Sequence, residues 1–349
     1  MNFTLYPVYW LADQVDDEPF DLRQLPFDVV ENVTIEDVSA RFRENTFAVW
    51  TEQLGADIAE HLEDVRYALV HRYEPEPAVR VAEHEQTQAS ETLLRNLAAC
   101  LRLIRPMRQH ALLMRGTIRE DGSFDVGGFD VPALHLLEVP EVQRLFKLRN
   151  EDTVALRTYA PEFLRAMRGQ FWKFRMSVQF HELGHFQSLD WKARFLLWCS
   201  AIESIYTSHS REHQGSLVAT SRIKWFLGEN TSIYAPGDLP DLLDDPGITV
   251  GQVVTDLYEM RNFTAHGDRI PDPFFNTMLR HGFNGGVQKR EVLLEATSFI
   301  IRATLLRVLR DHLLNHFVDA DAADAYFDAQ GLTRVALVAQ LRAAAQRNP

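Results

Sequence analysis

Apolar residues recur at three- and four-residue intervals through most of the chain after residue 150, which is the spacing of buried helix faces. Residues suited to helix ends flank several of these segments: Pro161 fits a first helical turn, Asp190 an N-cap, and Gly228 and Gly267 C-terminal ends. This pattern predicts an up-and-down helical bundle. The expected helices cover residues 160–188, 190–208, 216–228, 249–267 and 288–317.

The first 150 residues have a mixed pattern. Aromatic and β-branched residues favour strands over 2–11 and 45–51. Helical spacing runs over 55–73 and again over 90–107, where Ser90 is an expected N-cap. Residues 114–131 predict a β-hairpin that turns at Asp121 and Gly122. The expected fold is therefore mainly α, with a C-terminal helical bundle and a smaller mixed α/β N-terminal domain.

We expect three parts along the chain. A mixed α/β domain covers 1–155, a helical bundle covers 156–320, and a loosely packed helical tail covers 321–349. We expect the N-terminal domain to be a sensor or regulator.

Composition restricts the classes of function. The chain has 349 residues and a formal net charge of -13, which argues against a sequence-blind nucleic-acid binder but permits a small basic cleft. No apolar run is long enough to span a bilayer, and the N-terminus lacks the pattern of a signal peptide. Cys100 and Cys199 lie in apolar helical segments, so we expect free thiols and a cytoplasmic protein.

The segment FHELGHFQS contains His181, Glu182 and His185 in the H-E-x-x-H spacing of zinc peptidases. A catalytic zinc needs a third protein ligand. The third histidine of one such pattern would fall at Trp191, and the downstream glutamate of another would be Glu203, within a strongly apolar helix. The helix is apolar on both sides, which favours two histidines buried in a bundle. We therefore expect no metal and no cofactor, with a zinc hydrolase as the less favoured alternative.

A second segment, YEMRNFTAHGD, contains Tyr258, Arg261, Asn262 and His266. Arginine followed by histidine at a similar spacing recurs in this chain, so the spacing alone selects nothing. The pattern Y-x-x-R-N-x-x-x-H-G, together with RFLLWCSAIESIY and ATSRIKWFLG in the same order, resembles the Apea-like branch of HEPN domains over about residues 165–317.

The resemblance implies a metal-independent endoribonuclease that acts as a homodimer on RNA, with Arg261, Asn262 and His266 as catalytic residues. RNA carries its own nucleophile, the 2′-hydroxyl, and an imidazole can exchange protons near neutral pH. An arginine can bind the scissile phosphate with two hydrogen bonds. Five residues of helix separate Arg261 and His266 by about 140°, so convergence needs a distorted helix end, long side chains or two copies. Glu203, Arg222 and Tyr258 are supporting candidates, and Glu203 and Arg222 each have a salt bridge inside the bundle as the structural alternative.

The expected role is a toxin or anti-phage defence effector that is held inactive until stress or infection, with an antitoxin or a phage-derived trigger as a possible partner. The alternative is a non-catalytic HEPN interaction or dimerisation module, in which His266 caps a helix end and Arg261 binds backbone carbonyls or a neighbouring glutamate.

Overall fold

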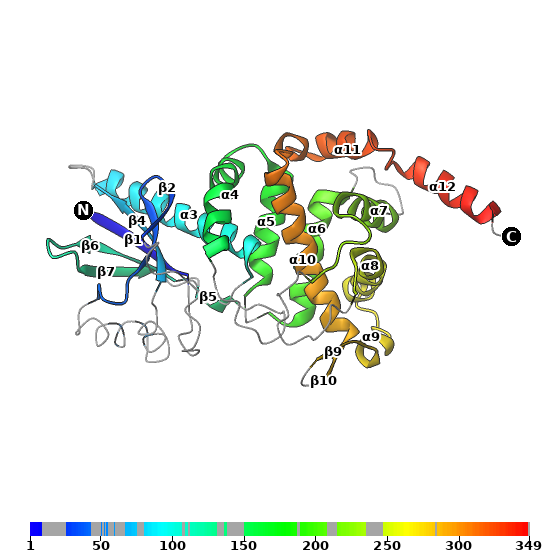
Figure 1. Cartoon of the computed structure of the whole chain (residues 1–349), viewed down its shortest axis with the longest axis horizontal. Coiled ribbons are helices and arrows are strands. Elements are labelled where there is room, and N and C mark those ends of the chain that lie inside the picture. The colour runs from blue at the N-terminus through cyan, green and yellow to red at the C-terminus, as the bar shows by residue number, and fades with distance from the viewer. Residues whose placement is uncertain are drawn as a thin grey trace. The chain divides into compact units, whose positions relative to one another are not determined.

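The computed structural model describes residues 1–8, 26–42, 50, 52, 54, 59, 67–74, 80–106, 109–110, 112–130, 136–137, 150–186, 189–207, 215–234, 247–282 and 285–347. The chain forms two compact units, one holding most of residues 1–165 and the other most of residues 166–349 (Figure 1). The division falls near residue 165, whereas the sequence placed it at 155. Both positions lie inside one helix, α4 (Asn150–Arg168).

A six-stranded antiparallel sheet in the order β2-β3-β4-β1-β6-β7 forms the centre of the N-terminal unit. Its strands are β1 (Asn2–Pro7), β2 (Phe27–Val30), β3 (Val33–Asp37), β4 (Tyr67–Tyr73), β6 (Leu113–Ile118) and β7 (Phe124–Asp130). The short strands β5 (Gln109–His110) and β8 (Leu136–Leu137) form a separate antiparallel pair. The predicted hairpin is confirmed as β6 and β7, with Gly122 at a φ of 81° in the turn.

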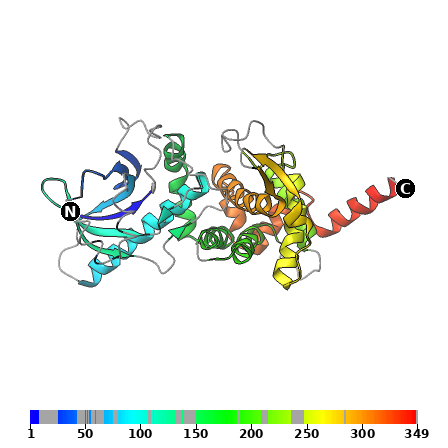
Figure 2. The ribbon, with the colours of Figure 1, turned by 90° about the horizontal axis from the view of Figure 1, so that it is seen from below.

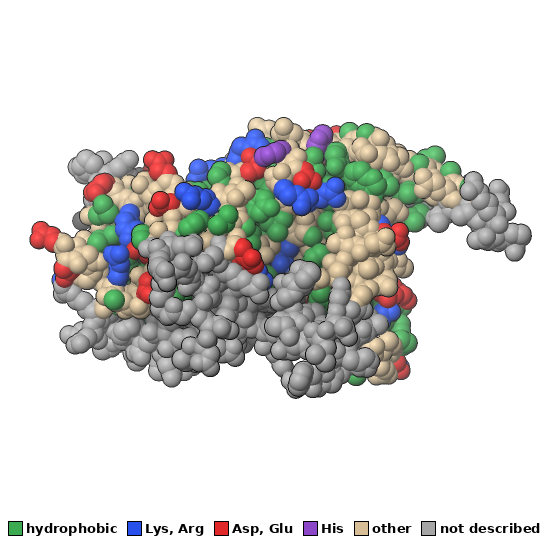
Figure 3. Space-filling model, in the orientation of Figure 1, with side chains coloured by type: hydrophobic (Ala, Val, Ile, Leu, Met, Phe, Trp, Pro, Cys, Tyr) green, Lys and Arg blue, Asp and Glu red, His purple; other side chains and the backbone are tan. Residues whose placement is uncertain are grey.

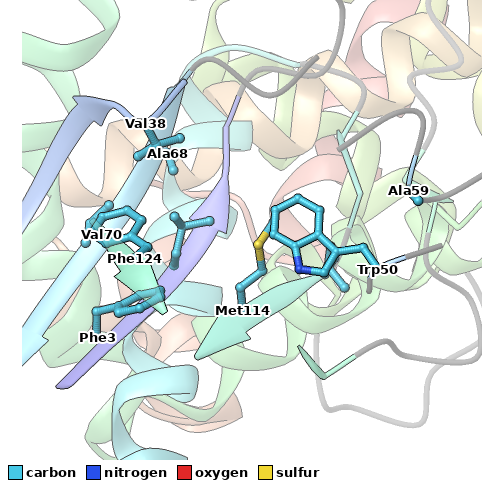
Figure 4. Close-up of a cluster of buried hydrophobic side chains, with 10 residues drawn as sticks. Phe3, Val38, Trp50, Ala59, Ala68, Val70, Met114 and Phe124 are labelled. Atoms are coloured by element: carbon cyan, nitrogen blue, oxygen red, sulfur yellow. The ribbon is translucent and has the colours of Figure 1, made fainter. Parts of the chain in front are cut away.

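One face of this sheet carries an apolar core (Figure 4). Alternate residues along a strand point to the same face, so Phe3 and Leu5 of β1 lie on the side occupied by Met114 and Phe124. The rings of Phe3 and Phe124 stack with their centroids 4.4 Å apart. Trp50 completes the cluster from outside the sheet.

The opposite face of the sheet is covered by α3 (Arg80–Ile104). Arg102 on this helix donates to the Tyr6 hydroxyl at 3.2 Å, and the Ser90 hydroxyl lies 2.7 Å from His71 Nδ1. The helix starts ten residues before the expected 90, so Ser90 is an interior residue and the predicted N-cap is wrong.

The expected helix over 55–73 is wrong at its end, because residues 67–73 form the strand β4. The first four residues of this strand are all buried, since the sheet is covered on both faces. A short, wholly apolar run of this kind does not distinguish a helix from a strand. The expected strand over 45–51 lies outside the described residues except at Trp50, which is helical.

Five helices pack together in the C-terminal unit (Figures 1 and 2). They are α5 (Trp172–Gly184), α6 (Trp191–Tyr206), α7 (Gly215–Leu227), α8 (Val250–His266) and α10 (Lys289–Arg310). The helix α10 contacts the other four and is buried around most of its circumference. The described part of the chain is thus mainly α, as predicted, while the HEPN-like arrangement of the bundle stays a prediction.

Two of the predicted helix ends are formed by the expected residues. The Asp190 carboxylate accepts from the backbone amides of Lys192 and Ala193 at 2.7 and 3.0 Å, as an N-cap does. Gly228 follows α7 with a φ of 90°, which is accessible to glycine without strain.

The expected long helix over 160–188 is wrong. It is two helices, α4 and α5, which are interrupted at residues 169–171, and Pro161 lies inside α4 instead of in a first turn. Gly169 lowers helix propensity at the break, and the Trp172 amide donates to the Val318 carbonyl rather than within a continuous helix.

Further elements of the C-terminal unit depart from the prediction. The expected helix over 288–317 ends at Arg310 and is followed by a short 3-10 helix, η2 (Leu314–Phe317). The sequence did not predict α9 (Pro273–Asn276) or the hairpin of β9 (Met278–Gly282) and β10 (Gly285–Gln288). The tail is helical, as expected, in α11 (Ala320–Asp328) and α12 (Arg334–Arg347). It is not loose at α11, where Phe327 is fully buried.

Charged side chains of both signs are interspersed over the visible face of the C-terminal unit (Figure 3). Among the described residues, no helix is long and apolar enough to cross a membrane.

Candidate functional site

The segment with the Y-x-x-R-N-x-x-x-H-G pattern is the second half of α8. This helix begins with a capping box. In it, the Gln252 side chain accepts a hydrogen bond of 2.8 Å from the Thr249 amide. The helix ends at Gly267, whose φ of 71° lies in the left-handed region that glycine adopts without strain. The Asp268 amide then donates to the Phe263 carbonyl at 2.9 Å. Both ends of the helix are therefore fixed by local sequence, and His266 is its last residue.

Arg261 is held by Glu203 of α6 through two hydrogen bonds. Its Nε lies 2.9 Å from Oε1 and its Nη2 lies 3.1 Å from Oε2 of the carboxylate. The exposed fractions of the two side chains are 29% and 24%, so the pair is partly shielded from water. This geometry is the bidentate arrangement that fixes both the position and the plane of a guanidinium. Glu203 thus forms the salt bridge inside the bundle that the sequence left open as its structural alternative, and the partner in it is the predicted catalytic arginine.

The ion pair with Glu203 uses only one edge of the guanidinium. An arginine has five N–H donors, and the Nη1–Nη2 edge is not engaged by the carboxylate. Nη1 lies 3.4 Å from the Oδ1 of Asn262, which is a long contact from an exposed side chain. Arg261 therefore presents an oriented donor edge beside the Asn262 amide.

His266 is exposed on the final turn of α8, and the helix is continuous from Arg261 to His266. Five residues of regular helix give a rise of about 7.5 Å and a rotation of about 140°. A distorted helix end is therefore not what brings these two side chains together. Their convergence requires long side chains or a second copy of the chain.

Tyr258 lies one turn before Arg261 and is 5% exposed. Burial raises the pKa of its hydroxyl well above the usual value, and the negative charge of Glu203 raises it further. The same two causes raise the pKa of the Cys199 thiol. Tyr258 therefore stays protonated, and its buried side chain has a packing role rather than one in proton transfer.

Arg222 has the structural role that the sequence left open as its alternative. Its side chain is 1% exposed and contacts Asp324 at 2.7 Å and Asp328 at 3.4 Å, both on α11. It also donates to the Tyr206 carbonyl at 3.2 Å, and its guanidinium lies 4.8 Å from the centre of the Phe327 ring. Arg222 thus joins α7 to the C-terminal helices and is not part of the Arg261 site.

Two basic residues at the start of α10, one of which contacts α8, were not predicted from the sequence. Lys289 contacts Asp256 of α8 at 2.7 Å and lies 4.9 Å from the ring centre of Phe274, which packs against Phe263. Arg290 stacks on aromatic rings at 5.2 and 5.4 Å. The only signal for them was the run QKRE at the start of α10, a common composition for a first helical turn.

The histidines of the H-E-x-x-H segment are buried, at 0% and 1% exposure, with His181 in the last turn of α5 and His185 as the C-cap residue that follows it. Across the described parts of the chain, no three His, Cys, Asp or Glu side chains gather in a group that could hold a metal ion.

Comparison of the chain with protein-family models, with curated proteins and with solved structures gives no match.

Proposed function

We propose that the chain is a metal-independent endoribonuclease whose site is formed by Arg261, Asn262 and His266 at the end of α8. The observation that supports it best is the Glu203–Arg261 pair, which fixes the guanidinium while leaving its second donor edge unengaged by the carboxylate. A guanidinium that is oriented in this way can bind a phosphate through its remaining donors.

The reaction is an intramolecular transesterification of RNA. The 2′-oxygen attacks the adjacent phosphorus and forms a new P–O bond, the P–O5′ bond breaks, and the products are a 2′,3′-cyclic phosphate and a 5′-hydroxyl. A base removes the proton of the 2′-hydroxyl, and an acid gives a proton to the departing 5′-oxygen. An imidazole can perform either task, and His266 is the exposed imidazole of this segment.

Arg261 and Asn262 act on the phosphate. The equatorial oxygens gain negative charge as the fifth P–O bond forms, and the Nη1–Nη2 edge of the guanidinium donates to them. The exposed Asn262 amide is a further donor and acceptor that orients the phosphate or the 2′-hydroxyl.

The site is completed by a second copy of the chain. Side chains five residues apart on one regular helix point about 140° away from each other. One α8 therefore does not present both Arg261 and His266 to the same phosphate at close range. Two α8 ends facing a common cleft supply two histidines, one as base and one as acid. The function in the cell is that of a toxin or defence effector, with the N-terminal unit as the regulator.

The test uses the purified full-length chain and an RNA oligonucleotide, with a matched oligonucleotide that carries a 2′-deoxy sugar at the mapped cleavage position. We expect cleavage of the RNA alone, with a cyclic phosphate on the 5′ fragment and no effect of EDTA on the rate. Cleavage of the deoxy substrate, or loss of activity with EDTA, contradicts the mechanism. A folded dimer that cleaves no RNA, and whose expression does not slow growth, supports the non-catalytic interaction module instead.

A further inference from the structure

The two histidines of the H-E-x-x-H segment converge on one point inside the C-terminal unit. Their Nε2 atoms lie 3.1 Å apart, and the planes of the two rings are inclined by 82°. Both side chains are essentially without solvent exposure. Residues four apart share one helix face, which allows this convergence but does not require it, because each ring can adopt other rotamers.

The packing of α6 against α5 fixes the backbone and the rings of this pair. The Trp198 indole N–H donates to the His181 carbonyl at 3.1 Å, and its ring lies edge-on to that of His185 with centroids 5.4 Å apart. Gly184 makes this approach possible, since a Cβ at that position would lie 2.3 Å from the indole nitrogen. The arrangement therefore depends on Trp198 and Gly184 as well as on the helical spacing of the histidines.

The distance between the two nitrogens is close to that of two ligands on one tetrahedral ion. Zn–N bonds of about 2.0–2.1 Å at a tetrahedral angle place two nitrogen ligands about 3.3 Å apart. We propose that His181 and His185 bind one divalent transition-metal ion, preferably Zn²⁺, through their Nε2 atoms. Imidazole suits zinc, copper and nickel, and the helical spacing is that of paired histidine ligands.

The position of Glu182 indicates an ion that is bound rather than used for hydrolysis. Its Oε1 lies 3.6 Å from His181 Nδ1, on the opposite side of the imidazole from Nε2. This distance is longer than a hydrogen bond, but the carboxylate lies near the non-ligating nitrogen, where the outer carboxylates of metal sites are found. A general base for hydrolysis would instead lie beside water bound to the ion.

Two histidines supply two of the four positions of a tetrahedral ion. The ion joins the last turn of α5 to the residue that caps it, and both rings pack against Trp198 of α6, so binding stabilises the folded C-terminal unit by mass action. This site is separate from the proposed ribonuclease site, because His181, Glu182 and His185 lie at the C-terminal end of α5, whereas Arg261, Asn262 and His266 lie on α8.

The experiment uses tag-free, full-length chain that is first freed of metal by a chelator. Co²⁺ is titrated while its visible absorption is followed, Zn²⁺ is quantified per chain, and thermal unfolding is measured with and without Zn²⁺. We expect one ion per chain, a tetrahedral Co²⁺ spectrum and a higher melting temperature with Zn²⁺. His185→Gln should lose all three, whereas His316→Gln, which removes an exposed imidazole from η2, should keep them.

If the His185→Gln variant does not fold, the Co²⁺ and thermal-unfolding measurements on the wild-type chain are enough to overturn the proposal. No Co²⁺ spectrum and no thermal shift in the wild type mean that the pair is an N–H···N hydrogen bond. Stoichiometric binding that persists in a folded His185→Gln variant also overturns it. Because all readouts are binding or stability, they are unaffected by whether the chain cleaves RNA.

Discussion

Glu203 of α6 binds Arg261 of α8 through two hydrogen bonds of 2.9 and 3.1 Å, so the guanidinium of the proposed site is oriented before any substrate arrives. We regard Glu203 as a positioning residue that acts through Arg261. This relationship also explains why a glutamate is placed in an otherwise apolar helix.

Glu203→Gln tests this relationship. The amide keeps the shape of the side chain but loses the charge and one acceptor oxygen, so Arg261 is held less firmly. Misplacement of this kind is expected to lower kcat for RNA cleavage by roughly 10- to 100-fold. Glu162→Gln is the matched control, because Glu162 pairs with Arg165 on the surface of α4. Faster cleavage by Glu203→Gln would show that Glu203 restrains Arg261 instead of positioning it.

Gly184→Ala should destabilise the C-terminal unit. The added Cβ would lie 2.3 Å from Trp198 Nε1, so either the indole or α5 must move. Overpacking of this kind lowers the free energy of unfolding by about 1–3 kcal/mol. Leu183→Ala is the control, since Leu183 is 44% exposed. Its loss should change stability by less than about 0.5 kcal/mol. Denaturant unfolding of both variants checks the prediction, and equal stabilities would contradict it.

Arg222→Met should loosen the C-terminal helices without impairing RNA cleavage. It removes the buried partner of Asp324 and Asp328. Breaking a buried ion pair lowers the free energy of unfolding by roughly 3–5 kcal/mol. Because these carboxylates are partly exposed, we expect a loss at or below the lower end of this range. Limited proteolysis should then cut near α11. The exposed Arg310→Met should cost no more than about 1 kcal/mol. Loss of cleavage in a folded Arg222→Met variant would instead place Arg222 in the site.

His71 should make the stability of the N-terminal unit depend on pH. Burial lowers the pKa of His71 from its ordinary 6.5, so the folded state binds the proton less readily than the unfolded state. The stabilisation is therefore present above about pH 6.5 and is lost as pH falls through that value towards the lower folded pKa. His71→Asn, whose amide can still reach Ser90, should flatten this dependence. The free energy of unfolding is measured with denaturant at about pH 7.5 and about pH 5.5. His84→Asn is the control, because His84 is an exposed residue of α3. An unchanged slope in His71→Asn would contradict the assignment.

The sequence predicted those parts of the fold that local chemistry decides. Asp190 begins a helix where expected, and Gly228 and Gly267 end helices where expected. These residues act on backbone groups within one turn of themselves, so the local sequence is enough to predict them. The strand over 67–73 was missed, because a short buried apolar run is compatible with a helix or a strand. Its pairing with β1 and β3 makes it a strand, and those partners are distant in sequence. Ser90 was misplaced because its partner, His71, is distant in sequence.

The same division holds for the candidate site. Arg261, Asn262 and His266 were found as a motif, and their local setting at the end of α8 agrees with the expectation. The pairing of Arg261 with Glu203 and of Arg222 with α11 depends on how helices pack, which spacing along the chain does not reveal. The convergence of His181 and His185 depends on rotamers that Trp198 and Gly184 select.

The most direct measurement of the central claim compares RNA cleavage by His266→Ala and His84→Ala, prepared as full-length chains of equal melting temperature. Both substitutions remove an exposed imidazole from a helix, but only His266 belongs to the proposed site. We predict a loss of roughly 10²- to 10⁴-fold in kcat for His266→Ala and an unchanged rate for His84→Ala. Wild-type cleavage by a folded His266→Ala variant would contradict the claim.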